Sequence, residues 1–341
     1  MMMYKISKEN LPALLKKISQ TQDLFVPSKI SGKTNYALYD ENTEVDLETL
    51  KTVKSGKDLF FPQSETLYTC LKDGKKISIE PQKLREEKFV VFGMKACDVA
   101  GVEILDRVFL SDPVDTFYKA RRDHGTIVSL ICNEPDGSCF CKAFGIDNTA
   151  PKGDVVLAKA GDDYYWESKS EKGNALTEEV KELLSSCDDS ALKAEKEKIQ
   201  KINGMLPNMN ISLKNWGKDE NLEIFSSENW EKLSSACLAC GTCTFVCPTC
   251  QCYDIKDYDT GHGVQRYRCW DSCMYSDFTM MAHGNNRTTQ MQRYRQRFMH
   301  KLVYFPTNND GVFSCVGCGR CVDLCPSGLN ILKVIKKWEE K

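Results

Sequence analysis

Two copies of one cysteine motif occupy the last third of the chain and constrain its fold more than any other feature. Both copies follow the spacing Cys-x2-Cys-x2-Cys-x3-Cys-Pro. Three thiolates at this spacing can curl around one face of an iron–sulfur cube, leaving backbone N–H groups free to bond the cluster sulfides. The motifs therefore predict two 4Fe-4S clusters. The copies are Cys237, Cys240, Cys243, Cys247 and Pro248, and Cys315, Cys318, Cys321, Cys325 and Pro326.

The fourth cysteine of each copy is expected to serve the other cluster, as it does in two-cluster ferredoxins. This crossed pairing defines two predicted sites. A pair of zinc sites is the alternative, but zinc needs four thiolates per ion and no third cysteine in step. Site 1 is Cys237, Cys240, Cys243 and Cys325, and site 2 is Cys315, Cys318, Cys321 and Cys247.

A third set of cysteines lies in the first half of the chain. Cys97 and Cys132 each follow a predicted buried strand, and two more thiols come shortly afterwards in the run CNEPDGSCFC. Ligands collect at the carboxyl ends of strands in an α/β sheet, and the amino end of a helix after Cys97 favours a thiolate. We expect a third 4Fe-4S cluster here; buried structural thiols or zinc are the alternatives. Site 3 is Cys97, Cys132, Cys139 and Cys141.

Composition places the chain among soluble globular proteins. It is 41% hydrophobic and 28% charged with a net charge of -2, which does not suit a general nucleic-acid binder. The first residues lack the apolar region of a secretory signal, and no apolar run is long enough to span a membrane. With 18 cysteines in such a chain, we expect a cytoplasmic protein whose thiols are metal ligands and not disulfides.

A length of 341 residues predicts two domains of α+β class. Residues 1–205 show an α/β pattern: a strand pair within 58–80, a buried strand at 88–93, a helix at 99–110, a strand at 126–131, a hairpin at 154–169 and charged helices at 175–202. Residues 203–227 are the best linker candidate. Residues 228–341, with a helix expected at 288–303, should form a mostly helical ferredoxin-like domain that holds two clusters.

Beyond the general cysteine motif, several segments resemble one known family. The chain is similar, over nearly its whole length, to the iron–sulfur subunit of three-subunit anaerobic sulfite reductases and to the beta subunit of cytoplasmic sulfhydrogenases. The segments are KACDVAGVEILDRVFL (95–110), CNEPDGSCFC (132–141), CLACGTCTFVCPTCQCYD (237–254), WDSCM (270–274) and CVGCGRCVDLCP (315–326).

The resemblance implies an electron-relay subunit that is not catalytic alone. Its partners would be a flavin subunit that oxidises NAD(P)H and a catalytic subunit, with anaerobic sulfite reductase first and a hydrogenase or sulfur reductase second. No Gly-rich dinucleotide or phosphate-binding motif occurs in the sequence, so the flavin and nicotinamide are expected on a partner. A cluster-based redox sensor is the alternative from another class, but it needs an output domain that the sequence does not suggest.

Two weaker signals lie between the motifs. Cys250, Cys252, Cys269 and Cys273 suit either a further metal site or buried thiols packed around the clusters. Residues 261–305 also contain six arginines and Lys301 against two aspartates. This basic stretch could raise cluster potentials, bind an acidic partner, or simply be a solvated helix face.

Overall fold

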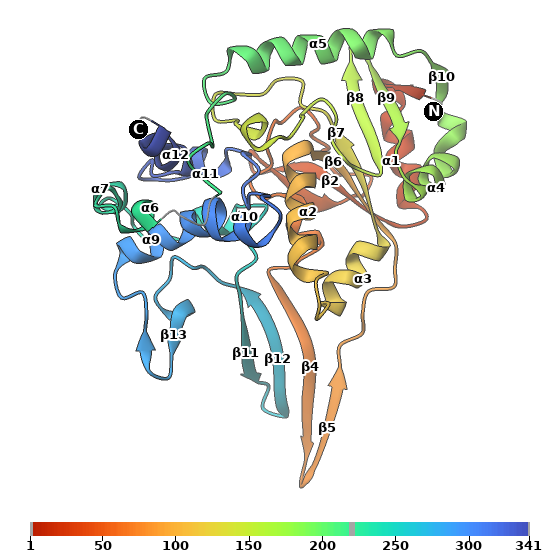
Figure 1. Ribbon diagram of the computed structural model, residues 1–341. Coiled ribbons are helices and arrows are strands. Elements are labelled where there is room, and N and C mark those ends of the chain that lie inside the picture. Colours follow the sequence, from red (N-terminus) through yellow and green to blue (C-terminus); the bar gives the residue numbers. More distant parts are fainter. Residues whose placement is uncertain (1–2, 218–221, 340–341) are drawn as a thin grey trace.

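The first half of the chain is built around an eight-stranded mixed sheet (Figure 1). The computed structural model describes residues 3–217 and 222–339. The strand order is β10-β1-β9-β8-β7-β6-β2-β3. The strands are β1 (Met3–Ser7), β2 (Asp23–Ile30), β3 (Lys33–Leu38), β6 (Phe89–Lys95), β7 (Gly125–Leu130), β8 (Val155–Ala160), β9 (Asp163–Ser168) and β10 (Ser185–Cys187).

The centre of this sheet is parallel. β2, β6, β7 and β8 run in the same direction, whereas the outer strands pair antiparallel. β7 is buried throughout and β6 is buried up to its last residue, which is half-buried. Strands covered on both faces are continuous apolar runs of this kind. The parallel centre aims the carboxyl ends of β6 and β7 at one edge of the sheet, where Cys97 and Cys132 follow.

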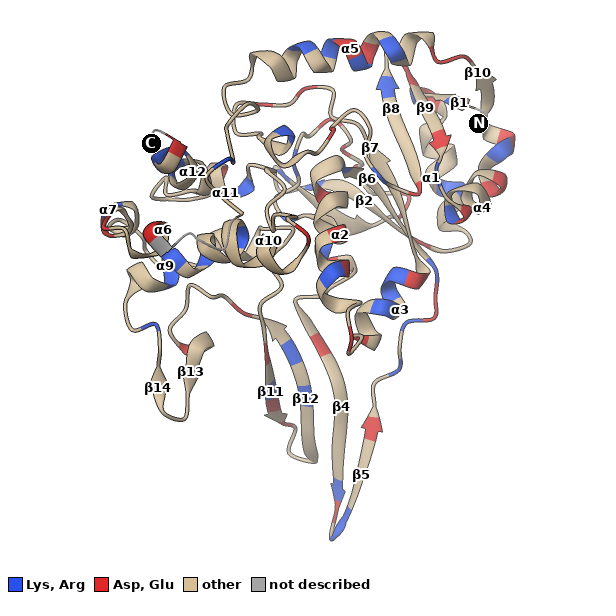
Figure 2. Ribbon diagram, in the orientation of Figure 1, with Lys and Arg blue, Asp and Glu red and all other residues tan. Residues whose placement is uncertain are grey.

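Helices cover both faces of the sheet. Val90 and Phe92 of β6 pack into a core with α1 (Leu11–Ser19) and α4 (Glu171–Val180). Val91 points to the opposite face, where α2 (Ala96–Phe109) and α3 (Thr116–His124) complete a second core. This alternation follows from the period of two residues in a strand. α5 (Ser190–Met205) covers β8 and β9, and Figure 2 shows acidic and basic side chains interspersed along it.

A second sheet joins the two halves of the chain and projects from the body (Figure 1). Its order is β11-β12-β4-β5, so strands from both halves are neighbours. At its base the buried Arg268 guanidinium donates to a Glu65 carboxylate oxygen at 2.7 Å. Residues 253–270 were expected in a mostly helical domain, and they form strands because residues 64–73 supply a partner strand. The strands are β4 (Ser64–Asp73), β5 (Lys76–Pro81), β11 (Tyr253–Asp259) and β12 (Gly263–Trp270).

Short helices surround the two cysteine motifs. Trp230, Trp338 and Phe298 belong to the core that holds these helices together. The longest, apart from the last, begins at a capping box between Thr289 and Gln292 and continues into a π-helical turn at His300–Tyr304. The helices are α6 (Leu222–Ser226), α7 (Asn229–Ser234), α8 (Thr242–Phe245), α9 (Gln290–Met299), α10 (Phe305–Asn308), α11 (Arg320–Asp323) and α12 (Ile331–Glu339); β13 (Met280–Met281) and β14 (Gly284–Asn285) form a small hairpin.

Most elements expected in the first half of the chain are present. The hairpin at 154–169 corresponds to β8 and β9, and the strand pair within 58–80 to β4 and β5. The helix expected from residue 99 begins at Ala96, three residues earlier. The charged segment 175–202 is interrupted by β10, which pairs with β1. Part of the predicted linker, residues 218–221, lies outside the described residues, and the division into two domains stays a prediction.

Within 3–217 and 222–339, none of the helices combines the length and the apolar character that crossing a bilayer requires.

Candidate iron–sulfur centres

The four thiols of site 1 line one cavity. Cys237, Cys240 and Cys243 come from the first motif, and Cys325 comes from the end of the second. The side chains of Tyr294 and Arg297 on α9 form part of the wall. The structure therefore groups these four cysteines as the crossed pairing predicts. Their role as cluster ligands stays a prediction.

The four thiols of site 2 line a second cavity. Cys315, Cys318 and Cys321 are joined there by Cys247 from the first motif. Phe140, Lys301 and Arg297 also line this cavity, among other residues. Arg297 is thus a wall residue of both sites, which makes sites 1 and 2 direct neighbours.

Left-handed backbone conformations shape both motif loops. Ala239 and Gly241 have φ of 53° and 73°, and Gly317 and Gly319 have φ of 59° and 79°. These residues stand two and four positions after the first cysteine of each motif. Glycine adopts such a conformation without steric cost, so each loop can coil back and turn its thiols inward. Ala239 is the one position of the four that has a side chain.

Donors surround the thiols. Gln290 Nε2 lies 3.4 Å from Cys237 Sγ, and the backbone N–H of Leu329 donates to Cys325 Sγ at 3.2 Å. The hydroxyl of Thr242 lies 3.3 Å from Cys240 Sγ. Hydrogen bonds from this hydroxyl and from the Thr242 backbone lower the pKa of the Cys240 thiol. Thiolate is the form that binds iron, so these donors prepare the site for metal.

Unpaired buried donors test whether the two cavities fit a cluster. Tyr294 Oη and Arg297 Nε, which belong to wall residues, have no hydrogen-bond partner in the described structure, nor has Ser314 Oγ beside Cys315. A buried polar atom without a partner is costly, and most are satisfied in native proteins. Sulfide and thiolate sulfurs of a 4Fe-4S cluster accept such hydrogen bonds. The residues present therefore fit the cofactor, which supplies one-electron redox chemistry when bound.

Site 3 is also assembled in the fold. Cys97 lies in the first turn of α2, and Cys132 follows β7 by one residue. Cys97, Cys139 and Cys141 are buried in one cluster of side chains, and Cys132 is close enough to Cys141 for its charge to affect the Cys141 pKa. Burial raises the pKa of Cys139 and Cys141 to about 12 each. Without metal these thiols are neutral, so ligation would have to displace their protons.

One expectation about Cys97 is not met. The helix dipole of α2 was expected to favour its thiolate, but burial raises the pKa of Cys97 well above its ordinary value, and Asp98 adds to the rise. The dipole contributes a modest stabilisation at an exposed helix end, whereas loss of solvation of a fully buried thiolate is larger.

Sites 2 and 3 meet through their loops. The N–H of Phe140, between Cys139 and Cys141, donates to the carbonyl oxygen of Gly317 at 2.9 Å. A Cβ atom on Gly317 would lie 2.4 Å from the Phe140 oxygen. The two loops are therefore in direct contact, and only glycine permits the approach.

A lysine fixes the loop of site 3 to the second motif. The Lys51 ammonium lies 3.0 Å from Asp136 Oδ2 and 2.6 Å from Asp323 Oδ2. Asp136 belongs to the loop that carries Cys139, and Asp323 to α11. Burial alone would raise the pKa of Asp136, but hydrogen bonds from Ser138 and Lys51 and the lysine charge lower it to about 2. The carboxylate stays ionised at neutral pH and holds the loop in place.

The remaining cysteines fall into two groups. Cys250 and Cys273 are buried near site 2 and site 1, and the Cys252 and Cys273 thiols are hydrogen-bonded to each other. Cys269 is a half-buried residue of β12. All cysteines are free thiols. Among the described residues no three His, Cys, Asp or Glu side chains form a single-ion site, whereas cube ligands are spread over four iron atoms.

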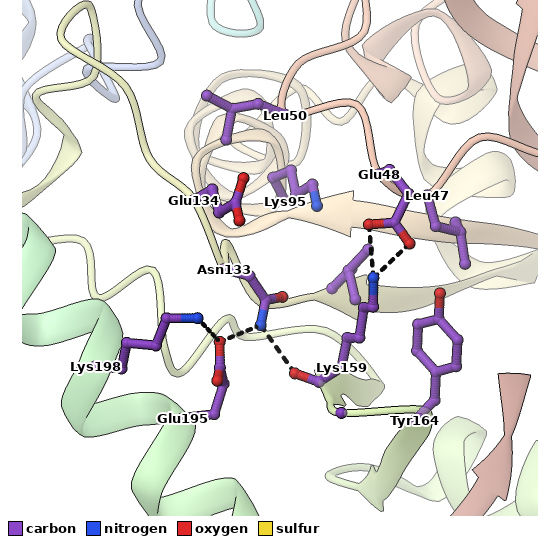
Figure 3. Close-up of a pocket in the computed structure, with 12 residues that line it drawn as sticks. Leu47, Glu48, Leu50, Lys95, Asn133, Glu134, Lys159, Tyr164, Glu195 and Lys198 are labelled. Carbon is purple, nitrogen blue, oxygen red and sulfur yellow. Dashed lines mark hydrogen bonds and ion pairs between the residues drawn. The ribbon is translucent and has the colours of Figure 1, made fainter.

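A polar hollow lies at the carboxyl ends of β6 and β7 (Figure 3). The Lys159 ammonium pairs with Glu48 at 2.7 Å, and Asn133 Nδ2 donates to Glu195 Oε1 at 2.8 Å. Its lining contains lysines and glutamates in equal number and no thiol. The hollow is therefore not a further candidate for a cluster.

Comparison with known proteins agrees with the geometry. Residues 236–329 match the family model of a 4Fe-4S dicluster domain. Over 340 residues the chain is 30% identical to sulfhydrogenase 2 subunit beta of Pyrococcus furiosus, and the match covers 98% of each chain. The chain belongs to the sulfhydrogenase beta family of 4Fe-4S dicluster proteins. It is an iron–sulfur electron-transfer subunit. No solved structure matches it.

In this member of the sulfhydrogenase beta family, three buried cations are functional candidates that sequence reasoning did not single out. Arg297 and Lys301 lie in the basic stretch, but they are only 2% and 4% exposed, and Lys57 is also buried. Lys57 Nζ donates to the Cys250 oxygen at 2.9 Å and lies over the Trp270 ring. The available signal was position: Arg297 stands next to Phe298 of the predicted apolar stripe, and Lys301 follows one turn later.

Proposed function

We propose that the chain relays electrons through three adjoining iron–sulfur sites. The observation that carries this proposal is contiguity: sites 1 and 2 share Arg297 as a wall residue, and sites 2 and 3 share the contact between Phe140 and Gly317. Electron tunnelling falls steeply with distance, so centres that share a wall exchange electrons fastest. A single structural or storage cluster would not need this series.

The proposed ligands are the twelve cysteines of the three sites. Sites 1 and 2 would hold the two 4Fe-4S clusters of the dicluster domain, and site 3 would hold a third. Support for the third comes from four buried thiols in one place and from its contact with the second motif. A zinc ion or plain structural thiols at site 3 remain the outcomes that metal analysis separates.

Site 1 is the candidate point of exchange with a partner. Cys240 is exposed, and the neighbouring Leu238 side chain is 68% exposed. The thiols of sites 2 and 3 are half-buried or buried. An electron donor or acceptor bound over the 237–243 loop would therefore reach site 1 first, with sites 2 and 3 leading inward toward α2 and the large sheet.

The partners follow from the family. We propose a cytoplasmic complex with a flavin subunit that oxidises NAD(P)H and with a catalytic subunit. The relative is named a sulfhydrogenase subunit, which supports a hydrogenase or sulfur-reductase type of catalytic partner for this chain. The sequence resemblance had placed anaerobic sulfite reductase first, and this stays the second candidate. Family membership also favours a relay over a redox sensor.

An anaerobic purification of the tagged chain from its native host tests this function. We expect copurification of a flavoprotein and a catalytic subunit, with about eight to twelve iron atoms per chain, because each cube holds four. Addition of NAD(P)H should bleach the cluster absorbance of the complex but not of the isolated chain. Four or fewer iron atoms in fully reconstituted protein would contradict the relay.

A further inference from the structure

Arg297 is a buried cation placed between two thiol sites. Its side chain lines the cavities of both site 1 and site 2 and is 2% exposed. The guanidinium donates to Cys250 Sγ at 3.1 Å, to Thr244 Oγ1 at 3.2 Å and to the Cys243 carbonyl oxygen. No carboxylate within the described part of the chain forms an ion pair with it, and its Nε has no acceptor there.

Lys301 lies one turn beyond Arg297 and lines site 2 but not site 1. Its ammonium is buried and donates to Thr249 Oγ1 and to the Ser314 carbonyl oxygen, each at 2.7 Å. It too has no carboxylate partner among the residues described. Lys301 belongs to the π-helical turn His300–Tyr304. Such turns are rare and frequent at functional sites, and here the turn carries a lysine into the wall of site 2.

Burying a charge without a counter-ion is strongly unfavourable. The protein surrounds these two cations with neutral acceptors, so an anion is missing from the described protein groups. A 4Fe-4S cluster bound by four thiolates carries net negative charge, and reduction adds one more. A fixed cation in a medium of low dielectric constant stabilises the reduced cluster more than the oxidised one, because attraction grows with the charge.

We propose that Arg297 is a shared electrostatic residue that raises the reduction potentials of the clusters in sites 1 and 2 together, whereas Lys301 raises that of site 2. The inference rests on the proposed function, since it requires both clusters. Its consequence is that one residue keeps the two potentials in step. Electrons then pass between sites 1 and 2 without a large uphill step.

The test is an EPR-monitored redox titration of the full-length, anaerobically reconstituted protein. Arg297→Gln removes the charge at similar size. Arg295→Gln is the matched control, because Arg295 has the same formal charge two residues away and stacks on the Phe225 ring 3.7 Å from its centroid, outside both cavity walls. The signals are assigned to the two sites by their loss in Cys240→Ser and Cys318→Ser.

Arg297→Gln should lower the potentials of both clusters, each by at least a tenfold change in the one-electron equilibrium, which corresponds to about 59 mV. Lys301→Met should lower that of site 2 more than that of site 1, and Arg295→Gln should change neither. Potentials in Arg297→Gln equal to those of Arg295→Gln overturn the inference while leaving the relay intact. Failure of the parent itself to bind two clusters is the different result that overturns the relay.

Arg297→Lys decides the case in which Arg297→Gln loses iron. This variant keeps the charge and changes the shape. Two bound clusters with nearly parental potentials support an electrostatic role. Loss of iron in Arg297→Lys as well would show that the sites need the guanidinium shape, and the inference would be wrong.

Discussion

Asp98 and Arg320 form a bidentate ion pair in the interior of the protein. Arg320 Nη1 lies 2.5 Å from Asp98 Oδ1, Nη2 lies 2.8 Å from Oδ2, and both residues are 2% exposed. Asp98 follows Cys97 of site 3, and Arg320 stands between Cys318 and Cys321 of site 2. One ion pair therefore connects the helix that begins at site 3 to the motif that forms site 2.

Asp98→Asn should destabilise the fold strongly. The change leaves a fully buried guanidinium without its counter-ion, and breaking a buried pair in this way costs about 3 to 5 kcal/mol. We expect a large drop in the denaturant midpoint, followed anaerobically by circular dichroism. Asp310→Asn is the control: its pair with Arg107 is on the surface, where such pairs contribute about 0 to 1 kcal/mol. Similar midpoints for the two variants would contradict this account of the pair.

Gly317→Ala should separate the loops of sites 2 and 3. The new methyl group would meet the Phe140 oxygen at 2.4 Å, and the left-handed φ of 59° adds backbone strain. Gly145→Ala is a matched control, because its φ is 73° and its Cβ would meet nothing within 4 Å. The difference in stability between the two variants measures the close approach alone. We expect Gly317→Ala to be less stable and to lose iron more readily, and equal behaviour would argue against a tight contact.

Cys247→Ser should damage the cluster of site 2 although the residue belongs to the first motif. Cys247 lines the site 2 cavity with three thiols of the second motif. EPR of the reduced protein should show loss or conversion of that cluster, with site 1 retained. Cys70→Ser on β4 serves as the control and should leave both signals unchanged. Loss confined to the cluster of site 1 would refute the crossed pairing.

Cys139→Ser should cost a whole cluster. A cube is bound as a unit by four thiolates, so iron should fall by about four atoms while the clusters of sites 1 and 2 remain reducible by dithionite. Electron transfer from NAD(P)H through the complex should fall as well. Cys187→Ser is the control, because this half-buried residue of β10 lies outside all three sites. Unchanged iron and spectra in Cys139→Ser would return the site 3 cysteines to a structural role.

The sequence by itself determined the parts that depend on local spacing. The two motifs predicted which eight cysteines gather into two groups, because the spacing of cysteines and left-handed residues fixes how each loop coils. The buried strands predicted that Cys97 and Cys132 would meet at one sheet edge, since consecutive parallel strands end at the same edge. Resemblance over nearly the whole chain indicated the family.

Only the tertiary structure decided how distant segments meet. Residues 253–270 became strands because residues 64–73 lie beside them, and no local pattern specifies such a partner. Arg297 and Lys301 read as part of a basic stretch that could equally face water. Their burial follows from the packing of α9 between two motifs that are far apart in sequence, and that packing alone makes a surface-like charge an internal one.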